Sequence, residues 1–309
     1  MNRKSFGTLA AGAIALSPFP AFAASNTVRL GDLPIEADGQ PYYADQLGLF
    51  KKAGLDVEVI SITNGAAILS GVLGGSMEIG VSNIISLASA YKRGIKIACV
   101  SGSSLYTSKA PTSALMVSNG SVIRAARDLS GKTIAVNGLR NITQLAAMAW
   151  IDKNGGDSAS VKFVELSFPE MIPAVSQGRV DAVLVAEPAV SSAKGSARIL
   201  GYPYDAVAPR FLLGCFFTTT AYLAQNQQTV KRIVDVLRAA GNWANQHHSE
   251  SGQMLAAVTK IDVNVIQNMT RATYPDKMLI SDVQPVIDLA AKYGVIAESF
   301  PAAEIIWNG

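Results

Sequence analysis

From Val28 onward, short runs rich in Val and Ile alternate with stretches whose apolar residues recur at helical spacing. This alternation is typical of α/β proteins, in which helices cover mostly parallel sheets. The strands that it predicts are 28–30, 57–60, 78–81, 95–100, 114–117, 133–136, 162–165, 182–185 and 213–219. The helices that it predicts between them are 41–53, 65–74, 84–92, 143–154, 169–177 and 188–194.

After Tyr222 the alternation stops and only helical patterns follow, at 230–245, 252–259, 263–270 and 281–293. A chain of 309 residues is long for a single core and suits two domains. The pattern predicts that the chain crosses into a second lobe near Ser113 and returns near Phe216, which leaves the last helices on the first lobe. We therefore expect two lobes, 24–113 with 217–309, and 114–216, joined by strands. Each lobe should be a mixed, mostly parallel sheet flanked by helices.

The first 23 residues are predicted to be a signal peptide. Arg3 and Lys4 precede an apolar run of 11 residues, and Ala21, Phe22 and Ala23 form a small-x-small cleavage pattern. The apolar run is shorter than the ~20 residues of a membrane-spanning helix, so we expect cleavage after Ala23. No Cys stands at the cut to carry a lipid, which favours free diffusion in the periplasm over anchoring.

The charges nearly balance, with 26 Lys and Arg against 23 Asp and Glu, and no basic stripe occurs. Nucleic acid is therefore not an expected partner. The two cysteines, Cys99 and Cys215, lie in apolar, strand-like runs. Export permits a disulfide between them, but buried free thiols remain the alternative, because the sequence does not give their separation.

Catalytic and metal-binding motifs are missing from the sequence. The triplet Gly131, Lys132 and Thr133 resembles the end of a phosphate-binding loop, but Ala126 stands where that motif requires Gly. No nucleophile elbow, dinucleotide fingerprint or zinc-protease helix occurs, and the only histidines are His247 and His248. We therefore expect binding without chemistry, no cofactor and no metal.

Three segments in the expected order resemble the periplasmic binding proteins of importers for taurine, alkanesulfonates, nitrate and thiamine precursors. They are 40–59, which begins Gln-Pro-Tyr-Tyr-Ala-Asp-Gln-Leu-Gly-Leu-Phe; 128–136, which reads Asp-Leu-Ser-Gly-Lys-Thr-Ile-Ala-Val; and 177–188, which contains Gly-Arg-Val-Asp-Ala and ends Glu-Pro. The resemblance implies a two-lobed type II periplasmic binding protein that closes on a ligand like a Venus flytrap. It also implies a small-molecule ligand and the permease of an ABC transporter in the inner membrane as partners. We expect the protein to be a monomer.

The candidate ligand-binding residues follow strand ends, where open α/β sheets bind ligands and where helix N-termini attract anions. In the first lobe they are Gln40, Tyr42, Gly65, Asn83 and Tyr106; in the second lobe they are Asn137, Arg140, Asn141, Ile142 and Glu187, and Thr218 lies on the returning strand. The alternative role of Asn141 and Glu187 is helix capping, and the alternative for Arg140 is solvent exposure.

The expected function is that of an extracytoplasmic solute-binding subunit for a small anionic or polar organic ligand. A sulfonate, nitrate or aromatic carboxylate fits Arg140 and the helix N-termini. Tyr42, Tyr43 and Tyr106 also suit a ring, which leaves a thiamine-precursor pyrimidine as an alternative. A sensor module that presents its ligand to a membrane receptor would use the same binding chemistry. The fungal enzymes of this fold that make the thiamine pyrimidine carry a cysteine cluster, which this chain lacks.

Overall fold

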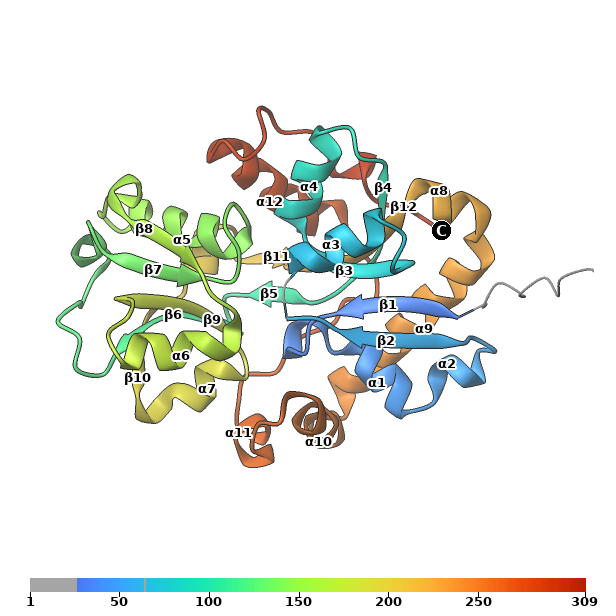
Figure 1. Cartoon of the computed structure of the whole chain (residues 1–309), viewed down its shortest axis with the longest axis horizontal. Coiled ribbons are helices and arrows are strands. Elements are labelled where there is room, and N and C mark those ends of the chain that lie inside the picture. Colours follow the sequence, from blue (N-terminus) through green and yellow to red (C-terminus); the bar gives the residue numbers. More distant parts are fainter. Residues whose placement is uncertain (1–26, 64) are drawn as a thin grey trace, which may run out of the picture.

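Two five-stranded sheets organise the chain, and the computed structural model describes residues 27–63 and 65–309 of it. The sheets lie in separate lobes, with helices on their faces (Figure 1). The predicted signal peptide and the position of Asn64 lie outside the described residues. Across the described part of the chain, no helix combines the length and apolar character that a membrane crossing requires.

The first sheet has the strand order β2-β1-β3-β12-β4. Its strands are β1 (Val28–Asp32), β2 (Val57–Ser61), β3 (Ile79–Asn83), β4 (Ile97–Gly102) and β12 (Gly214–Thr219). β1 runs parallel to β2 and β3, whereas β12 is antiparallel to both β3 and β4. The helices of this part of the chain are α1 (Gln40–Gln46), α2 (Leu49–Lys52), α3 (Gly65–Leu73) and α4 (Ile84–Lys92). Alternating β and α segments thus build the lobe in the predicted way.

The second sheet has the strand order β10-β6-β9-β7-β8. Its strands are β6 (Ser113–Ser118), β7 (Thr133–Val136), β8 (Lys162–Glu165), β9 (Ala182–Ala186) and β10 (Ala197–Gly201). The helices that follow its parallel strands are α5 (Ile142–Lys153), α6 (Phe168–Ser176) and α7 (Ala189–Ser192). β7 is parallel to β8 and β9, whereas β6 is antiparallel to β9 and β10. Both sheets are therefore mixed.

The chain passes between the lobes through a two-stranded ribbon. β5 (Leu105–Thr107) leads out of the first lobe and pairs antiparallel with β11 (Arg210–Leu212), which leads back. Tyr106 and Phe211 are fully buried in this ribbon, and their ring centroids lie 5.3 Å apart. The lobes are thus connected by paired, packed strands. β12 belongs to the first sheet and β6 to the second. The predicted lobe limits, 24–113 with 217–309, and 114–216, stay a prediction.

The C-terminal part of the chain is helical, with α8 (Thr220–Gln225), α9 (Gln227–Gln246), α10 (His248–Thr259), α11 (Val263–Gln267) and α12 (Ile280–Lys292). α9 packs against α1, and α12 packs against α4. An isolated bridge between Cys99 and Ile306 brings the end of the chain to β4. The last helices therefore cover mainly the first lobe.

Cys99 and Cys215 are both buried free thiols. They lie on neighbouring strands of the first sheet, where β12 pairs with β4. Burial raises the pKa of the Cys215 thiol well above its ordinary value. The sequence left open whether these cysteines form a disulfide or stay free, and in the structure both are free.

Candidate ligand-binding site

A cavity of about 140 Å³ lies between the two lobes, at the carboxyl ends of their parallel strands. The first lobe contributes the segment after β1 and the starts of α3 and α4. The second lobe contributes the turn between β7 and α5 and the ends of β8 and β9. Both lobes thus supply its walls, as a receptor that closes on its ligand requires.

Five of the predicted binding residues line this cavity: Gly65, Asn83, Asn137, Asn141 and Ile142. They come from both lobes and from three different strand-to-helix turns. The structure brings these residues together because parallel strands place their carboxyl ends at the same edge of a sheet. Their contact with a ligand stays a prediction.

Two of these residues cap helices as well as line the cavity. The Asn83 Oδ1 atom accepts a hydrogen bond from the Ser86 N–H at 3.0 Å at the start of α4. The Asn141 Oδ1 atom accepts from the N–H groups of Thr143 at 3.0 Å and Gln144 at 3.3 Å at the start of α5. For Asn141 the structure has the capping role that was considered for it, and for Asn83 the capping role is an addition to the prediction. The caps also mean that several N–H groups of the two helix N-termini already have acceptors.

Four predicted residues are buried outside the cavity lining, with hydrogen bonds inside the protein. The Gln40 amide donates to the Gly102 carbonyl at 2.9 Å, and the Tyr42 hydroxyl lies 2.9 Å from the Ser61 hydroxyl. The other two are Tyr106, which donates to Asp205 at 2.8 Å, and Thr218, which donates to the Glu78 carbonyl at 2.6 Å. These side chains support the first lobe and the crossing ribbon.

Arg140 spans the boundary between the lobes instead of lining the cavity. Its backbone has a left-handed φ of 57°. Its Nη2 atom donates to the carbonyl oxygens of Gly294 at 3.1 Å and Val295 at 3.3 Å, beyond the end of α12. Beside it, the Tyr293 hydroxyl donates to Asp152 on α5 at 2.9 Å. We call the contacts of Arg140 and Tyr293 the lobe latch.

Glu187 lies in a neighbouring hollow of about 360 Å³ with mostly apolar walls, which include Ile172, Val258 and Ile261. Its carboxylate accepts from the Ser191 N–H and the Ser191 hydroxyl, each at 2.9 Å. Glu187 therefore accepts hydrogen bonds from within α7, while Pro188 occupies the N-cap position of that helix.

The sequence analysis missed Asp38, a buried acid in the cavity wall. Asp38 ends the short 3₁₀ turn Glu36–Asp38 after β1 and is 7 % exposed. Burial raises the pKa of its carboxyl to about 7, although the nearby Ser103 hydroxyl acts in the opposite direction. Burial, reinforced by the charge of Asp38, also raises the pKa of Asp32 well above its ordinary value. The only sequence signal was an acidic pair within an otherwise apolar segment, 33–38.

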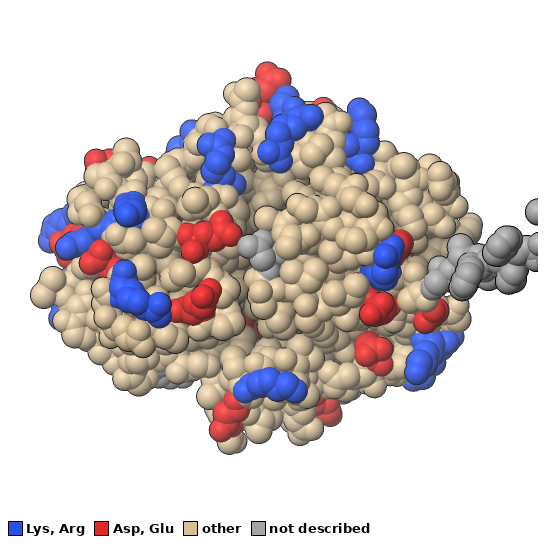
Figure 2. All heavy atoms as spheres, in the orientation of Figure 1, with Lys and Arg blue, Asp and Glu red and all other residues tan. Residues whose placement is uncertain are grey.

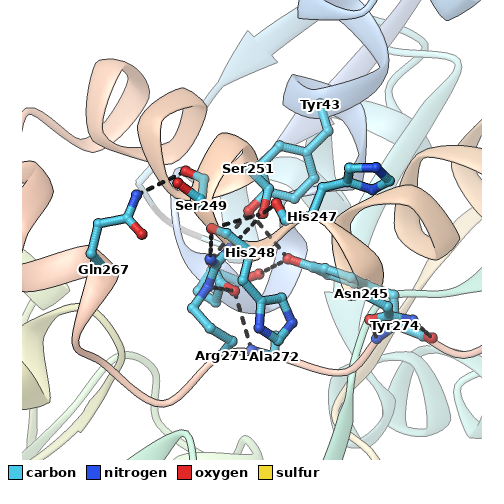
Figure 3. A network of polar contacts seen from close by, with 11 residues as sticks. Tyr43, Asn245, His247, His248, Ser249, Ser251, Gln267, Arg271, Ala272 and Tyr274 are labelled. Atoms are coloured by element: carbon cyan, nitrogen blue, oxygen red, sulfur yellow. Dashed lines mark hydrogen bonds and ion pairs between the residues drawn. The ribbon is translucent and has the colours of Figure 1, made fainter.

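A buried ion pair fixes the turn that carries Asp38. The Arg271 Nε atom lies 2.7 Å from the Glu36 carboxylate, and their side chains are 8 % and 1 % exposed. The same carboxylate accepts from the Ala272 N–H at 3.1 Å, and Arg271 also donates to the Ser251 hydroxyl at 2.9 Å (Figure 3). Burial raises the pKa of Glu36, and the Arg271 charge opposes that shift. The loop after β1 is thereby tied to the C-terminal helices.

Among the described residues, no group of three or more His, Cys, Asp and Glu side chains could hold a metal ion. On the face drawn in Figure 2, Lys and Arg atoms are dispersed among Asp and Glu atoms, and uncharged residues cover most of the surface.

Comparisons with known proteins agree with this architecture. A curated relative, the putative aliphatic sulfonates-binding protein of Bacillus subtilis (strain 168), is 27 % identical over 172 residues, which are 54 % of this chain and 50 % of the relative. The chain thus spans about half the length of the curated relative that it matches.

Solved structures match over nearly the whole chain. The alkanesulfonate-binding protein SsuA from Xanthomonas axonopodis pv. citri has a TM-score of 0.77 at 21 % identity, covering 92 % of this chain and 99 % of that one. The periplasmic nitrate-binding protein NrtA from Synechocystis PCC 6803 has a TM-score of 0.76 at 13 % identity, covering 88 % and 82 %. These likenesses confirm the predicted fold class, the two-lobed periplasmic binding protein fold. The family model described as NMT1/THI5 like matches residues 39–251, which is most of the sequence. The chain therefore belongs to the NMT1/THI5-like family.

Proposed function

We propose that this chain is the extracytoplasmic solute-binding subunit of an ABC importer, and that it captures a small anionic or polar organic molecule between its lobes. The observation that supports this most directly is the cavity to which both lobes contribute, next to a ribbon that can act as a hinge. A ligand that touches both walls stabilises the closed state, because only that state makes both sets of contacts. The protein then delivers the solute to a permease without chemical change.

The names of the similar proteins support the same role. The relatives named above bind aliphatic sulfonates, alkanesulfonates or nitrate, and one of them is called periplasmic. With the predicted signal peptide, these names favour a location outside the inner membrane.

The proposed function is tested by a thermal-shift screen of the chain from Ala24 onward. The compounds are sulfonates, nitrate, aliphatic and aromatic carboxylates, amines and pyrimidines. A compound at 100 times its dissociation constant should stabilise the folded state by ~2.7 kcal/mol, which raises the melting temperature by several degrees. If no class of compound shifts the transition of protein freed of co-purified ligand, solute binding is the wrong function.

Replacing Asn83 with Ala should weaken binding of the compound found in that screen, because Asn83 lines the cavity. The lost cap should also lower the free energy of unfolding by about 1 kcal/mol. Thr219→Ala is the matched control, since Thr219 caps α8 by accepting from the Tyr222 N–H at 3.1 Å and does not line the cavity. Calorimetric titration should show weaker binding for Asn83→Ala alone; equal affinities in both variants would remove Asn83 from the site.

Loss of the lobe latch should shift the protein toward its open state. Arg140→Ala and Tyr293→Phe each remove hydrogen bonds that join the lobes, worth about 1 kcal/mol, so the affinity should fall about fivefold. Tyr91→Phe is the control, because the Tyr91 hydroxyl donates to Glu304 at 2.7 Å away from the lobe boundary. Small-angle scattering should show a larger radius of gyration only for the latch variants. Unchanged affinity and size would show that the latch does not stabilise closure.

A further inference from the structure

The cavity wall is acidic. Asp38 and Glu165 are the charged side chains among the described residues that line it, and no Lys, Arg or His is among them. Arg140, the cation expected to meet an anion, instead donates to carbonyl groups beyond α12. A buried carboxylate facing a cavity attracts a positive group and repels an anion more strongly than a surface carboxylate does, because the surrounding protein screens charge weakly.

Several buried polar atoms lie behind the cavity wall. Three of them, Asp32 Oδ2, Gln40 Oε1 and Ser104 Oγ, have no hydrogen-bond partner within the described structure, and their residues do not line the cavity. The Gln40 oxygen is an acceptor only, whereas the Ser104 hydroxyl and the Asp32 carboxyl, whose pKa burial raises well above its ordinary value, can also donate. Ser103 adjoins Gly214 in the cavity wall, since a Cβ atom on Gly214 would lie 3.2 Å from the Ser103 Oγ atom. Of the helix N-termini at the cavity, those of α4 and α5 are capped by Asn83 and Asn141. The charged group that this buried wall offers a ligand is therefore an acceptor, the Asp38 carboxylate.

We propose that the solute bound in the cavity carries a positively charged nitrogen group, an ammonium or an amidinium, which pairs with the Asp38 carboxylate. This inference rests on the proposed function, because it assumes that the cavity between the lobes is where a solute binds. Pairing with Asp38 makes the site selective for cationic or zwitterionic solutes over simple sulfonates and nitrate.

Binding of such a group should change the number of protons that the protein carries. The titratable groups on which the charge of Asp38 acts are Asp32 on β1, Tyr42 on α1, Tyr204 on the crossing segment and Cys215 on β12, and Glu165 faces the same cavity. None of these groups is a cation. Glu36 is nearby in the chain but is paired with Arg271. Near pH 7 Asp38 is partly protonated, so a bound cation expels that proton and a bound anion would draw one in.

The test offers the protein a defined mixture of small metabolites in which cations, zwitterions, neutral compounds and anions are equally represented. The mixture includes benzylamine, benzamidine, benzamide, benzoate and benzenesulfonate as compounds matched in shape. The chain from Ala24 onward is unfolded and refolded to remove any co-purified solute, and retained compounds are identified by native mass spectrometry. Compounds with a positive nitrogen should be retained. Asp38→Asn should weaken their binding about ten- to hundredfold, as expected for loss of a charged hydrogen bond.

Asp45→Asn is the matched control, since it removes the same charge from an exposed position on α1 and should bind as the parent does. Should Asp38→Asn fail to fold, calorimetry of the parent in Tris and in phosphate buffer near pH 7 gives the proton count, and proton release supports the proposal. Retention of anions without a positive nitrogen, or proton uptake, overturns this inference and leaves the proposed function standing. Retention of no compound overturns both.

Discussion

Replacing Arg271 with Met should lower the free energy of unfolding by about 3 to 5 kcal/mol. The substitution leaves the Glu36 carboxylate, 1 % exposed, without its cationic partner in a buried site, and breaking one side of a buried ion pair costs this much. Arg271 also bonds to Ser251 and to the carbonyl group of His248, so its loss releases the loop after β1 from α10 (Figure 3). Chemical denaturation of parent and variant near pH 7 measures the difference.

Lys92→Met is the control for this prediction, because Lys92 pairs at 2.9 Å with Glu298, which is 75 % exposed. A surface pair of this kind is worth about 0 to 1 kcal/mol. The double variant Glu36→Gln with Arg271→Met should recover part of the loss, since it removes both buried charges. An Arg271→Met variant no less stable than Lys92→Met would mean that the ion pair is not a source of stability.

The contribution of Asp38 to the stability of the ligand-free protein should fall as the pH rises from about 4 to about 7. Asp38 has an ordinary pKa of 3.8 that burial raises to about 7 in the folded state. Over this range the folded protein keeps a proton that the unfolded chain has released, so raising the pH favours unfolding. A shift of about three units corresponds to about 4 kcal/mol. Asp32 and Glu36 have raised pKa values and act with the same sign.

Carboxyls with lowered pKa values, such as Glu78 and Asp152, have the opposite effect. The contribution of Asp38 is therefore measured as the difference in free energy of unfolding between the parent and Asp38→Asn. Near pH 4, Asp38→Asn and the parent should have the same free energy of unfolding. Near pH 8, that of Asp38→Asn should be higher by about 4 kcal/mol. Asp45→Asn should follow the parent across the whole range. Parallel curves for the parent and Asp38→Asn would show that the Asp38 carboxyl is hydrated in the folded state.

The parts of the fold that could be predicted were those with a periodic apolar pattern. The predicted strands 133–136 and 162–165 coincide with β7 and β8, and the predicted helix 84–92 coincides with α4. β5 and β11 were missed because strands of three residues are too short to show alternation. The predicted helix 41–53 is two helices, since Gly48 adopts a left-handed φ of 66° between α1 and α2.

The candidate site was predictable where it depends on topology. Asn83 ends β3 and Asn141 lies in the turn between β7 and α5, so their place at the cavity could be inferred from chain order. The direction of the Arg140 side chain could not, because its acceptors, Gly294 and Val295, lie far along the chain. Asp38 was missed because an acid ahead of a helix is usually a solvated part of the first turn. Its burial depends on elements such as β12 that are distant in sequence.

The position of β12 imposes an order on how the molecule is made. This strand lies between β3 and β4, yet it is synthesised only after the whole second sheet. The second sheet is formed by one continuous stretch of the chain, 113–201, so its strands can pair without waiting for later residues. The first sheet has a gap between β3 and β4 until residue 214 is synthesised, and such distant pairings form slowly. A nascent chain of this kind stays incompletely folded for longer.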